Sequence, residues 1–416
     1  MNSCDCDSAD KQGPALKPMD EALELLLGHA KAVGDIETVP TGEALGRVLA
    51  TPVTSQVDVP PWDNSAMDGY ALRSGDLPAA DTSLPVSQRI PAGAAAEPLE
   101  PGTAARIFTG APVPAGADAV VIQEVCCQEG ERVTVGQTVK PGANIRRAGE
   151  DIRSGQAISE AGTRLQPQHL GLAASVGVAQ LRVYRRLRVA VFSSGDELVM
   201  PGEPLGPGQI YNSNQFTLSG LLQGYGCEVL TLGIVEDTLE ATMQALADGA
   251  ERADLVLASG GVSVGDEDHV KPAVERLGSL DLWKIAIRPG KPLAFGHIGA
   301  TPFIGTPGNP VSLFVTFCLF ARPFILRAQG VADVRVPALS ARADFDWPKP
   351  DKRREFIRAR LELDIEGIAR VSAFPSRSSG VLSSVAWANG LAVIPERQVL
   401  KKGDPVQFLS FSELLS

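Results

Sequence analysis

The spacing of apolar residues changes several times along the chain, and each change predicts a different kind of element. From Asp20 onward, apolar residues such as Ala22 and Leu26 recur three or four positions apart. This spacing predicts a helix that begins behind an aspartate able to cap it. Between about 55 and 146, short apolar runs are broken by proline and glycine, which is typical of short strands joined by turns. We therefore expect an inserted β domain over 55–146.

A regular alternation of strand-like and helix-like runs begins at Arg188. The strand-like runs are apolar almost throughout, which is typical of strands buried on both faces of a parallel sheet. The expected strands span 188–194, 228–235, 254–259, 282–287 and 292–298. The expected helices span 213–224, 238–253 and 270–277. Residues 187–337 are thus predicted to form an α/β domain with a parallel-rich sheet.

The remaining segments have weaker patterns. Residues 1–17 are polar and have no apolar period, so we expect a disordered tail there. Residues 147–186 return to mixed helix and strand, with a helix near 168–176. Beyond about 337 the helical spacing stops, and the strand-like runs predict a small β domain over 338–416. The chain is therefore predicted to be a multidomain α/β protein.

The longest apolar stretch covers residues 311–321. It is shorter than the ~20 residues that a membrane-spanning helix needs. Pro310 stands in front of it, and proline is favoured in the first turn of a helix. We therefore expect a buried helix here and no membrane protein.

Composition limits the classes of function. The 416 residues include 38 Lys and Arg against 49 Asp and Glu, a net charge of −11. This balance argues against a broad nucleic-acid-binding surface, so any anionic ligand must bind in a local basic pocket. The six cysteines show no metal-ligand spacing, and the first residues do not form a signal peptide. We expect a cytoplasmic protein with reduced thiols.

Three consecutive strands of the predicted sheet end in unusual polar loops. The loops cover 193–197, 236–238 and 259–268. Glycine and serine at a strand end let backbone N–H groups approach a phosphate, and in parallel sheets ligands bind at the carboxyl ends of the strands. The same residues also fit ordinary turns and helix caps. Neither a dinucleotide-binding fingerprint nor a Walker loop is present.

Acidic residues in these loops favour a divalent cation. A carboxylate beside a phosphate repels it unless a metal ion lies between them, so Asp237 and Asp268 are candidate Mg²⁺ ligands. Helix N-capping explains both aspartates equally well. Glu197 likewise fits the first turn of a helix. The four histidines lie in unlike contexts, and no nucleophilic triad is indicated.

Cationic and rigid segments follow the third loop. Lys284 and Arg288 are four residues apart, so a continuous strand would place both on one face and Ile285 and Ile287 on the other. Two cations on one face suit an oxyanion, although a solvated face paired with acids has the same pattern. The loop over 305–311 contains two prolines and leads rigidly into the apolar helix.

Seven motifs in this order resemble those of the MoeA family, molybdopterin molybdenumtransferase, which is also represented by the E domain of gephyrin. The resemblance extends from about residue 18 to the C-terminus. The motifs cover 60–71, 106–121, 144–152, 193–198, 258–270, 287–292 and 305–312. A single motif of this length is weak evidence, whereas seven in order make a chance match implausible.

The resemblance implies the architecture and the activity. The expected subunit is elongated and forms a homodimer. It has a discontinuous linking domain over 18–54 plus 147–186, the inserted β domain, a MoaB/MogA-like α/β domain and a C-terminal β-barrel-like domain. The implied reaction inserts molybdate into adenylated molybdopterin and releases AMP. The active site of the family lies between the α/β domain and the inserted domain of the partner subunit, so Asp63 and Thr109 are expected to act in trans.

Site residues follow from the resemblance position by position. The expected catalytic residues are Asp63, Thr109, Asp151, Glu197, Asp237 and Asp268, with Asp237 and Asp268 also handling Mg²⁺. The expected substrate-binding residues are Ser194, Gly195, Ser259, Gly260, Gly261, Lys291, Pro307 and Pro310, with a molybdate pocket at Lys284, Arg288, Arg353 and Ser379. Position 288 is Arg where the family often has Lys, so a planar guanidinium replaces the compact ammonium group of lysine.

Three other functions compete with this interpretation. The related MogA-type domains adenylate molybdopterin, and tungstate is a tetrahedral dianion like molybdate. A dimeric scaffold that binds a peptide is a non-catalytic alternative. The implied partners are a molybdopterin-adenylating enzyme and other proteins of molybdenum-cofactor synthesis, with no nucleic acid and no membrane.

Overall fold

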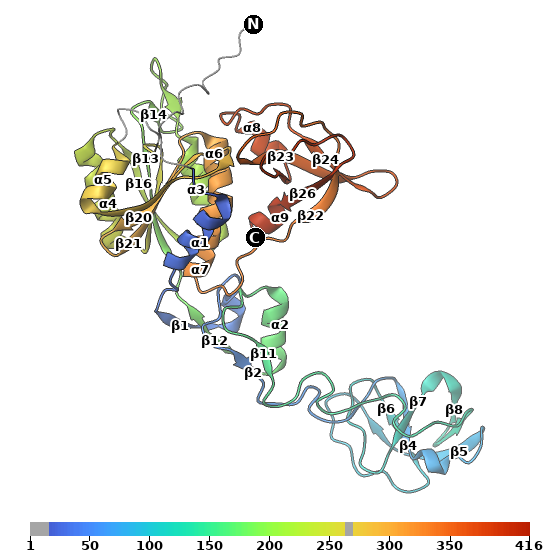
Figure 1. Cartoon of the computed structure of the whole chain (residues 1–416). Helices are drawn as coiled ribbons and strands as arrows, with labels where there is room; N and C mark the ends of the chain where they lie inside the picture. The colour runs from blue at the N-terminus through green and yellow to red at the C-terminus, as the bar shows by residue number, and fades with distance from the viewer. Residues whose placement is uncertain (1–15, 263–268) are drawn as a thin grey trace.

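The subunit is long, and its parts follow one another along the molecule. The computed structural model describes residues 16–262 and 269–416. Figure 1 shows an α/β domain beside the C-terminal β domain at one end, a small linking unit next to them, and the inserted β domain at the far end. The predicted multidomain α/β architecture is confirmed.

The α/β domain is built on a six-stranded mixed sheet. Its strand order is β16-β13-β17-β21-β20-β18. The first four strands are parallel, β20 is antiparallel to both of its neighbours, and β18 therefore runs in the same direction as the first four. The bounds are β13 Arg188–Ser194, β16 Glu228–Val235, β17 Leu255–Ser259, β18 Gly278–Lys284, β20 Pro292–Ile298 and β21 Thr301–Thr306. The predicted parallel-rich sheet is confirmed, and sequence reasoning missed β21 because proline and glycine interrupt its apolar run, Thr-Pro-Phe-Ile-Gly-Thr.

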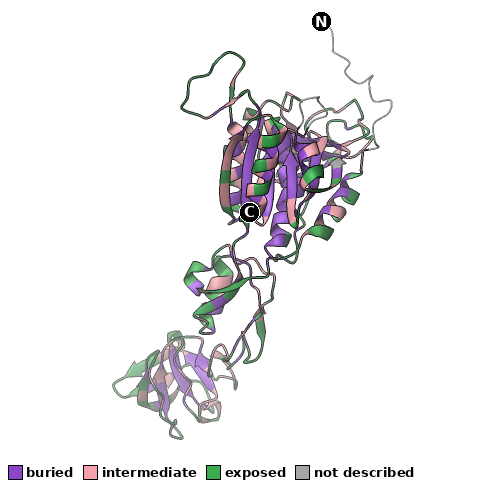
Figure 2. Ribbon diagram, turned by 90° about the vertical axis from the view of Figure 1, so that its left-hand side faces the viewer, coloured by how far each residue is buried: buried purple, intermediate pink, exposed green. Residues whose placement is uncertain are grey.

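Helices cover both faces of this sheet. One face packs against α1 (Met19–His29), α3 (Ser213–Gly224), α6 (Pro310–Thr316) and α7 (Arg322–Ala328) in the largest hydrophobic cluster. The other face packs against α4 (Leu239–Arg252) and α5 (Val270–Leu277). Figure 2 shows the sheet between them as buried. Burial on both faces explains why β13 and β17 are apolar almost throughout.

The predicted buried helix extends beyond the apolar stretch 311–321 on which the prediction was based. A π-helical segment, Phe317–Ala321, joins α6 to α7, so that the helix runs continuously over Pro310–Ala328. Within the described residues it is the one helix long and apolar enough to cross a membrane, but 94% of its most apolar window is buried inside the protein. It is therefore a core helix of the α/β domain.

The first helix docks on the α/β domain. Ala22 and Leu26 of α1 are fully buried in the same cluster as the core helix. The expectation that Asp20 caps α1 is wrong, because Pro18 is the N-cap residue and makes no side-chain cap. Asp20 instead accepts two hydrogen bonds from the guanidinium of Arg354, both 2.9 Å long. A bidentate ion pair with the C-terminal domain thus takes the place of the cap.

The linking unit is small and is built from both flanking segments. Strand β1 (Ile36–Pro40) pairs with β12 (Gln180–Tyr184), and β2 (Val53–Thr54) pairs with β11 (Ala157–Ser159). Helix α2 (Pro167–Ser175) covers a separate hydrophobic cluster that includes Leu49 and Val183. The chain therefore leaves and re-enters this unit around the inserted domain.

The inserted domain is a six-stranded sheet with the order β7-β4-β6-β5-β9-β8. Its strands are β4 Gly69–Leu72, β5 Thr82–Ile90, β6 Ala104–Ile107, β7 Ala119–Ile122, β8 Cys126–Glu129 and β9 Arg132–Val135. Tyr70 and Leu72 lie in one hydrophobic cluster and Ala71 in another, as the period of two requires. A Cβ at Gly69 would lie 1.8 Å from the carbonyl oxygen of Val121, so this strand pairing needs glycine.

The C-terminal domain is a closed barrel. Five strands form the ring β23-β24-β22-β26-β25, which a β23–β25 pairing closes. The bounds are β22 Leu339–Ala343, β23 Arg354–Leu363, β24 Ala369–Ala373, β25 Gly390–Ile394 and β26 Pro405–Ser410, with the short helices α8 Ser383–Trp387 and α9 Phe411–Leu414. The predicted β-barrel-like domain is confirmed.

The continuous strand expected from Lys284 to Arg288 is wrong. Lys284 ends β18 of the α/β sheet, whereas Arg288 lies in β19 (Ile287–Arg288), which pairs with β23 of the barrel. Between them, the N–H of Ala286 donates to the carbonyl of Lys17. Ile285 and Ile287 are fully buried on the core side. The chain leaves one sheet for another here because its backbone groups find new partners.

A testable prediction concerns the ion pair that joins β12 to the α/β domain. Arg185 donates to both carboxylate oxygens of Asp254 at 2.6 and 2.7 Å. Burial alone would raise the pKa of Asp254, but hydrogen bonds from Arg185 and from the N–H of Arg188 outweigh it and lower the pKa. The ion pair therefore stabilises the fold above the ordinary aspartate range near about pH 4, and its contribution is lost as pH falls through the lowered pKa.

Asp254→Asn should lower the free energy of unfolding by about 2 kcal/mol at pH 7. The deficit relative to the unchanged protein should shrink below about pH 4. Denaturant titrations across pH measure both effects. The exposed pair Asp248–Arg252, which is 2.7 Å long, offers a control, because Asp248→Asn should cost less than about 0.5 kcal/mol. A deficit for Asp254→Asn that stays constant down to pH 2 would contradict the prediction.

Candidate functional site

The loops at the carboxyl ends of the parallel strands enclose a cavity of about 730 Å³. Strand β13 ends at Ser194 and is followed by Gly195, β16 is followed by Asp237, and β17 ends at Ser259 before Gly260. The loop after β21, the start of α3 and the C-terminal domain complete the lining, with Pro307, Asn214 and Gly380 among their residues. These are the strand ends at which parallel sheets bind ligands. We call this hollow the strand-end cavity.

The glycines of the cavity allow a close approach of backbones. Gly260 and Gly261 have φ angles of +89° and +64°, a region that favours glycine. A Cβ at Gly260 would also lie 2.5 Å from the carbonyl oxygen of Ser194. The hydroxyl of Ser194 donates to Asp237 at 3.1 Å. Small residues thus leave the ends of β13 and β17 open enough to admit a ligand.

Asn214 is a cavity residue that sequence reasoning missed. It lies in the first turn of α3, and its Nδ2 donates to Ser259 Oγ at 2.9 Å and to the carbonyl of Gly308 at 2.7 Å. Its Oδ1 is buried and accepts no hydrogen bond within the described part of the chain. A buried acceptor without a partner is costly. The run of polar residues over 212–214 at the start of a predicted helix was the available signal.

The charge of the strand-end cavity is one-sided. Glu197 and Asp237 line it, whereas the described lining residues include no Lys, Arg or His. Asp268, the second predicted Mg²⁺ ligand, lies outside the described residues. Among the described lining residues, a phosphate entering this cavity would meet carboxylates and no protein cation. The donor set therefore fits a divalent cation held between carboxylate and phosphoryl oxygens.

A second cavity of about 640 Å³ is strongly basic. Its described ionisable lining residues are the cations Arg288, Lys291, Lys349, Lys352, Arg353 and Arg377, and the one carboxylate Asp351. We call it the basic cavity. Lys291 lines the basic cavity and the next residue, Pro292, lines the strand-end cavity. The two cavities therefore adjoin.

Asp351 organises the arginines of the basic cavity. It accepts hydrogen bonds from Arg288 at 3.0 Å and from two nitrogens of Arg353 at 3.0 and 2.9 Å. Burial alone would raise the pKa of Asp351, but hydrogen bonds from Arg353 and Arg288 outweigh it and hold the pKa well below its usual range. Asp351 stays ionised at neutral pH and fixes the two guanidinium groups.

Arg377 is fixed from another direction. It pairs with the buried carboxylate of Glu355 at 2.6 Å and lies over the Trp347 ring at 3.9 Å from its centroid. Sequence reasoning missed Arg377, Lys349 and Lys352, because all three lie in the C-terminal domain, where the family pattern is weakest. The runs of Lys and Pro over 349–353 were the only sequence signal.

Two members of the predicted molybdate pocket lie apart from the others. Arg288 and Arg353 line the basic cavity, but Lys284 and Ser379 are not among its described lining residues. Lys284 ends β18, where its carbonyl accepts from the N–H of Lys17 at 3.2 Å. The carbonyl of Ser379 accepts from the N–H of Val311 at the start of α6. The structure thus gathers Arg288, Lys291 and Arg353 and leaves Lys284 outside.

Three predicted catalytic residues take no part in either cavity of their own subunit, as far as the described residues show. Asp63 and Thr109 belong to loops of the inserted domain, which Figure 1 shows at the opposite end of the molecule from β13. Asp151 follows β10 (Ile145–Arg146) and donates its backbone N–H to Val59. None of the three is a described lining residue of either cavity. One subunit therefore does not bring the whole predicted set together.

The inserted-domain residues nevertheless form ordered polar contacts. Asp63 accepts hydrogen bonds from the N–H of Ala148 at 2.9 Å and from Arg147 at 2.6 Å, and both lower its pKa. The backbone and hydroxyl groups of Thr109 both donate to Asp68 at 2.8 Å, which lowers the pKa of Asp68. Asp63 and Asp68 are thus ionised carboxylates of the inserted domain, each fixed by its own local hydrogen bonds.

Comparison with known proteins agrees with this architecture. Three family models match: the MoeA N-terminal region (domain I and II) over 17–177, a probable molybdopterin binding domain over 190–327, and the MoeA C-terminal region (domain IV) over 340–411.

Relatives of known name resemble the chain over almost its whole length. A molybdopterin molybdenumtransferase of Haemophilus influenzae is 38% identical, covering 95% of this chain and 99% of that protein. One of Nostoc is 41% identical, covering 92% and 90%. The crystal structure of a Pyrococcus horikoshii molybdopterin biosynthesis moeA protein superposes with a TM-score of 0.84 at 31% identity, covering 95% of this chain and all of the other. The predicted family and the prediction of an enzyme are confirmed: the chain belongs to the MoeA family of molybdopterin molybdenumtransferases.

Proposed function

We propose that this protein inserts molybdate into adenylated molybdopterin and releases AMP, acting as a cytoplasmic homodimer. The observation that supports this most is the pair of adjoining cavities with opposite charge. A nucleotide-linked pterin and an oxyanion are two substrates of different chemistry that must meet. The contact between the cavities at Lys291 and Pro292 offers such a meeting point.

The strand-end cavity suits the phosphates of the adenylated pterin. Its glycine-rich loops let backbone N–H groups reach a pyrophosphate. Asp237 is held by Ser194 at the cavity wall and, with Asp268, is the proposed Mg²⁺ ligand. When bound there, Mg²⁺ neutralises the charge that develops on the phosphoryl oxygens. The Oδ1 of Asn214, which has no hydrogen-bond partner among the described residues, accepts a donor of the substrate.

The basic cavity suits molybdate. A tetrahedral dianion needs several convergent donors, and Arg288, Lys291 and Arg353 supply them. Asp351 balances only part of this charge. The same cavity accepts tungstate, because the two oxyanions share charge and shape. We propose that Lys284 and Ser379 act indirectly, by fixing the chain at the end of β18 and at the start of α6.

The reaction needs no protein nucleophile. An oxygen of molybdate or a water molecule attacks the phosphorus on the pterin side of the pyrophosphate bridge, the bond from that phosphorus to the bridging oxygen breaks, and AMP leaves with the bridging oxygen. The two dithiolene sulfurs bind the molybdenum, and one molybdate oxygen leaves as water with the two thiol protons. The arginines hold the oxyanion close to the bridge, so their contribution is proximity and charge stabilisation. The adenylated pterin comes from a separate adenylating enzyme.

The inserted domain completes the site from the partner subunit. Asp63 and Thr109 belong to the inserted domain, which lies at the far end of the subunit (Figure 1), and none of Asp63, Thr109 and Asp151 is a described lining residue of either cavity of its own chain. A homodimer in which each inserted domain covers the other subunit's cavities brings them there. Asp63 is ionised and fixed by Arg147, so it arrives preorganised.

The first test of this function replaces the proposed metal ligand. Asp237→Asn keeps an acceptor for Ser194 but removes the charge. We expect molybdate-dependent AMP release from adenylated molybdopterin to fall at least about 100-fold, because a preorganised electrostatic contact to the reacting group is lost. Asp248→Asn, an acid-to-amide change on the exposed face of α4, should leave turnover unchanged.

Three outcomes would contradict the assignment. Unchanged turnover in Asp237→Asn would mean that Asp237 is not the metal ligand. Absence of AMP release from the unchanged protein would favour a scaffold function. Formation of the adenylate from ATP and metal-free molybdopterin, without molybdate, would instead support an adenylyltransferase.

A second test separates the two cavities. Arg353→Gln should raise the KM for molybdate about 10-fold or more, since a charge-assisted hydrogen bond contributes about 1.5–3 kcal/mol. The affinity for the adenylated pterin should change little. Arg335→Gln is the matched control, because Arg335 is 87% exposed and pairs with Asp333 outside both cavities. Equal losses of affinity for both substrates would refute separate cavities. The same assay with tungstate measures oxyanion preference.

A third test asks whether the site is shared between subunits. Asp63→Ala and Asp237→Ala chains, each inactive as a homodimer, are co-expressed with different tags and isolated as mixed dimers. Sites completed in trans leave one intact site per mixed dimer, so about half of the normal activity should return, because independent sites contribute additively. No recovery in a verified mixed dimer would mean that both residues act within one chain or that Asp63 has no part.

A further inference from the structure

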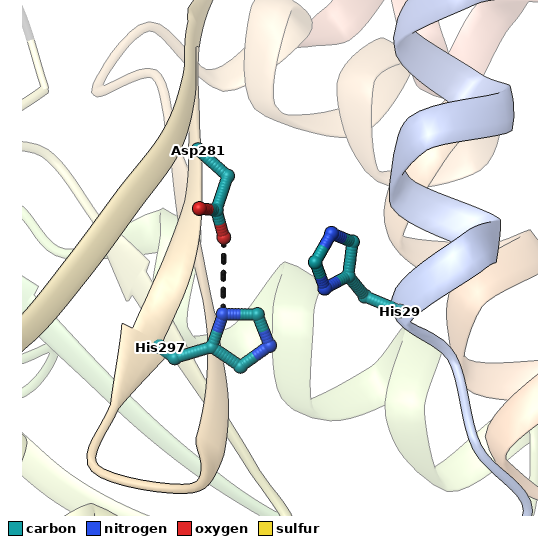
Figure 3. A group of neighbouring side chains, drawn as sticks. All are labelled: His29, Asp281 and His297. Atoms are coloured by element: carbon teal, nitrogen blue, oxygen red, sulfur yellow. Dashed lines mark hydrogen bonds and ion pairs between the residues drawn. The ribbon is translucent and has the colours of Figure 1, made fainter.

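We propose that His29, Asp281 and His297 bind a Zn²⁺-class transition-metal ion that ties the end of α1 to the edge of the α/β sheet. Figure 3 shows the His29 ring on α1 facing Asp281 and His297 on the sheet. Asp281 lies on β18 and His297 on β20. The ligand atoms of the three side chains all lie within 4.8 Å of one another. This site is independent of the proposed reaction.

The three side chains are already arranged around a common point. His297 Nδ1 and an Asp281 oxygen are 3.0 Å apart. The imidazole rings of His29 and His297 have centroids 5.0 Å apart, and the Phe295 ring packs against both. Bonds of about 2.0–2.2 Å place neighbouring ligand atoms roughly 3.3 Å apart around a tetrahedral zinc ion. A small inward rotation of the side chains reaches that geometry.

The backbone of the edge strand is distorted at the proposed ligand. The β18–β20 register shifts between Leu280 and Leu282, at Asp281. A bulge of this kind re-aims a side chain and often lies beside a site. The side chains of Asp281 and His297 are 27% and 20% exposed, and His29 is exposed, so an ion can reach the ligands.

The chemistry of the ligands selects the ion. Two imidazole nitrogens and one carboxylate suit Zn²⁺ and its neighbours in the first transition series, whereas Mg²⁺ and Ca²⁺ prefer oxygen ligands alone. Three protein ligands leave a fourth position for water. The site is also distinct from the strand-end cavity. His297 pairs with Pro302 near the start of β21, and the cavity lies at the other end of that strand, beyond Thr306.

Metal binding here would stabilise the docking of α1. His29 is the last residue of this helix, whose buried side chains pack on the core cluster. Because an ion binds only when His29 and the two strand residues are together, it favours the docked helix over any opened state. Slower amide hydrogen exchange in the last turn of α1 is the expected consequence.

The test is a titration of the metal-stripped full-length protein with Zn²⁺, followed by calorimetry. Separate His29→Gln, Asp281→Asn and His297→Gln variants should each lose one equivalent of bound Zn²⁺ or bind it at least about 100-fold more weakly, since even loss of a second-sphere contact costs about 10–100-fold. His169→Gln, which removes a histidine of the linking unit, is the control and should keep the full stoichiometry. Circular dichroism verifies that each variant is folded.

Two further measurements distinguish this site from others on the chain. Co²⁺ bound at these ligands should lack the intense thiolate charge-transfer band that cysteine ligands give. Hydrogen exchange at the end of α1 should slow on addition of Zn²⁺ in the unchanged protein and not in His29→Gln. Absence of Zn²⁺ binding, equal stoichiometry in all variants, or a thiolate band would each overturn the proposal.

Discussion

The positions of the site loops depend on the burial of β13 and β17 between two helical layers. Both strands are apolar on both faces and are covered by the core helix Pro310–Ala328 on one side and by α4 and α5 on the other. Strands confined in this way cannot slip in register without exposing apolar side chains. Their polar ends, Ser194 and Ser259, are therefore held at the same edge of the sheet, where the loops converge.

Charge is distributed between two neighbouring cavities rather than mixed in one. The strand-end cavity contains carboxylates and backbone donors, whereas the basic cavity contains arginines and lysines held partly by Asp351. Mixing the two sets would let them form ion pairs and would consume the donors that the substrates need. Their separation comes from the folding of the C-terminal barrel against β19, which carries Arg288 away from the α/β sheet.

The elongated shape of the subunit also separates the polar groups of the inserted domain from the two cavities. A small core supports its sheet, and its ionised carboxylates Asp63 and Asp68 are fixed by local hydrogen bonds. These carboxylates are preorganised, although neither is a described lining residue of a cavity in its own subunit. Fixed carboxylates of this kind are consistent with the contact to a second subunit that we propose.

The sequence by itself determined the local elements and the strand-end chemistry. Periodic apolar runs predicted the helices over 213–224 and 270–277 and the buried strands. The spacing of apolar residues in a segment follows from which of its positions face the core. Glycine, serine and aspartate at the strand ends indicated the cavity, since the edge of a parallel sheet follows from topology. The ordered motifs identified the family.

Only the tertiary structure decided which distant residues meet. A period of two placed Lys284 and Arg288 on one strand, but new backbone partners at Ala286 divided them between two sheets. Asp20 had the sequence of a cap and became a partner of Arg354, 334 positions away. His29 joined Asp281 and His297 in the same way. Such contacts depend on how domains pack, and the pattern of a single segment contains no information about its distant neighbours.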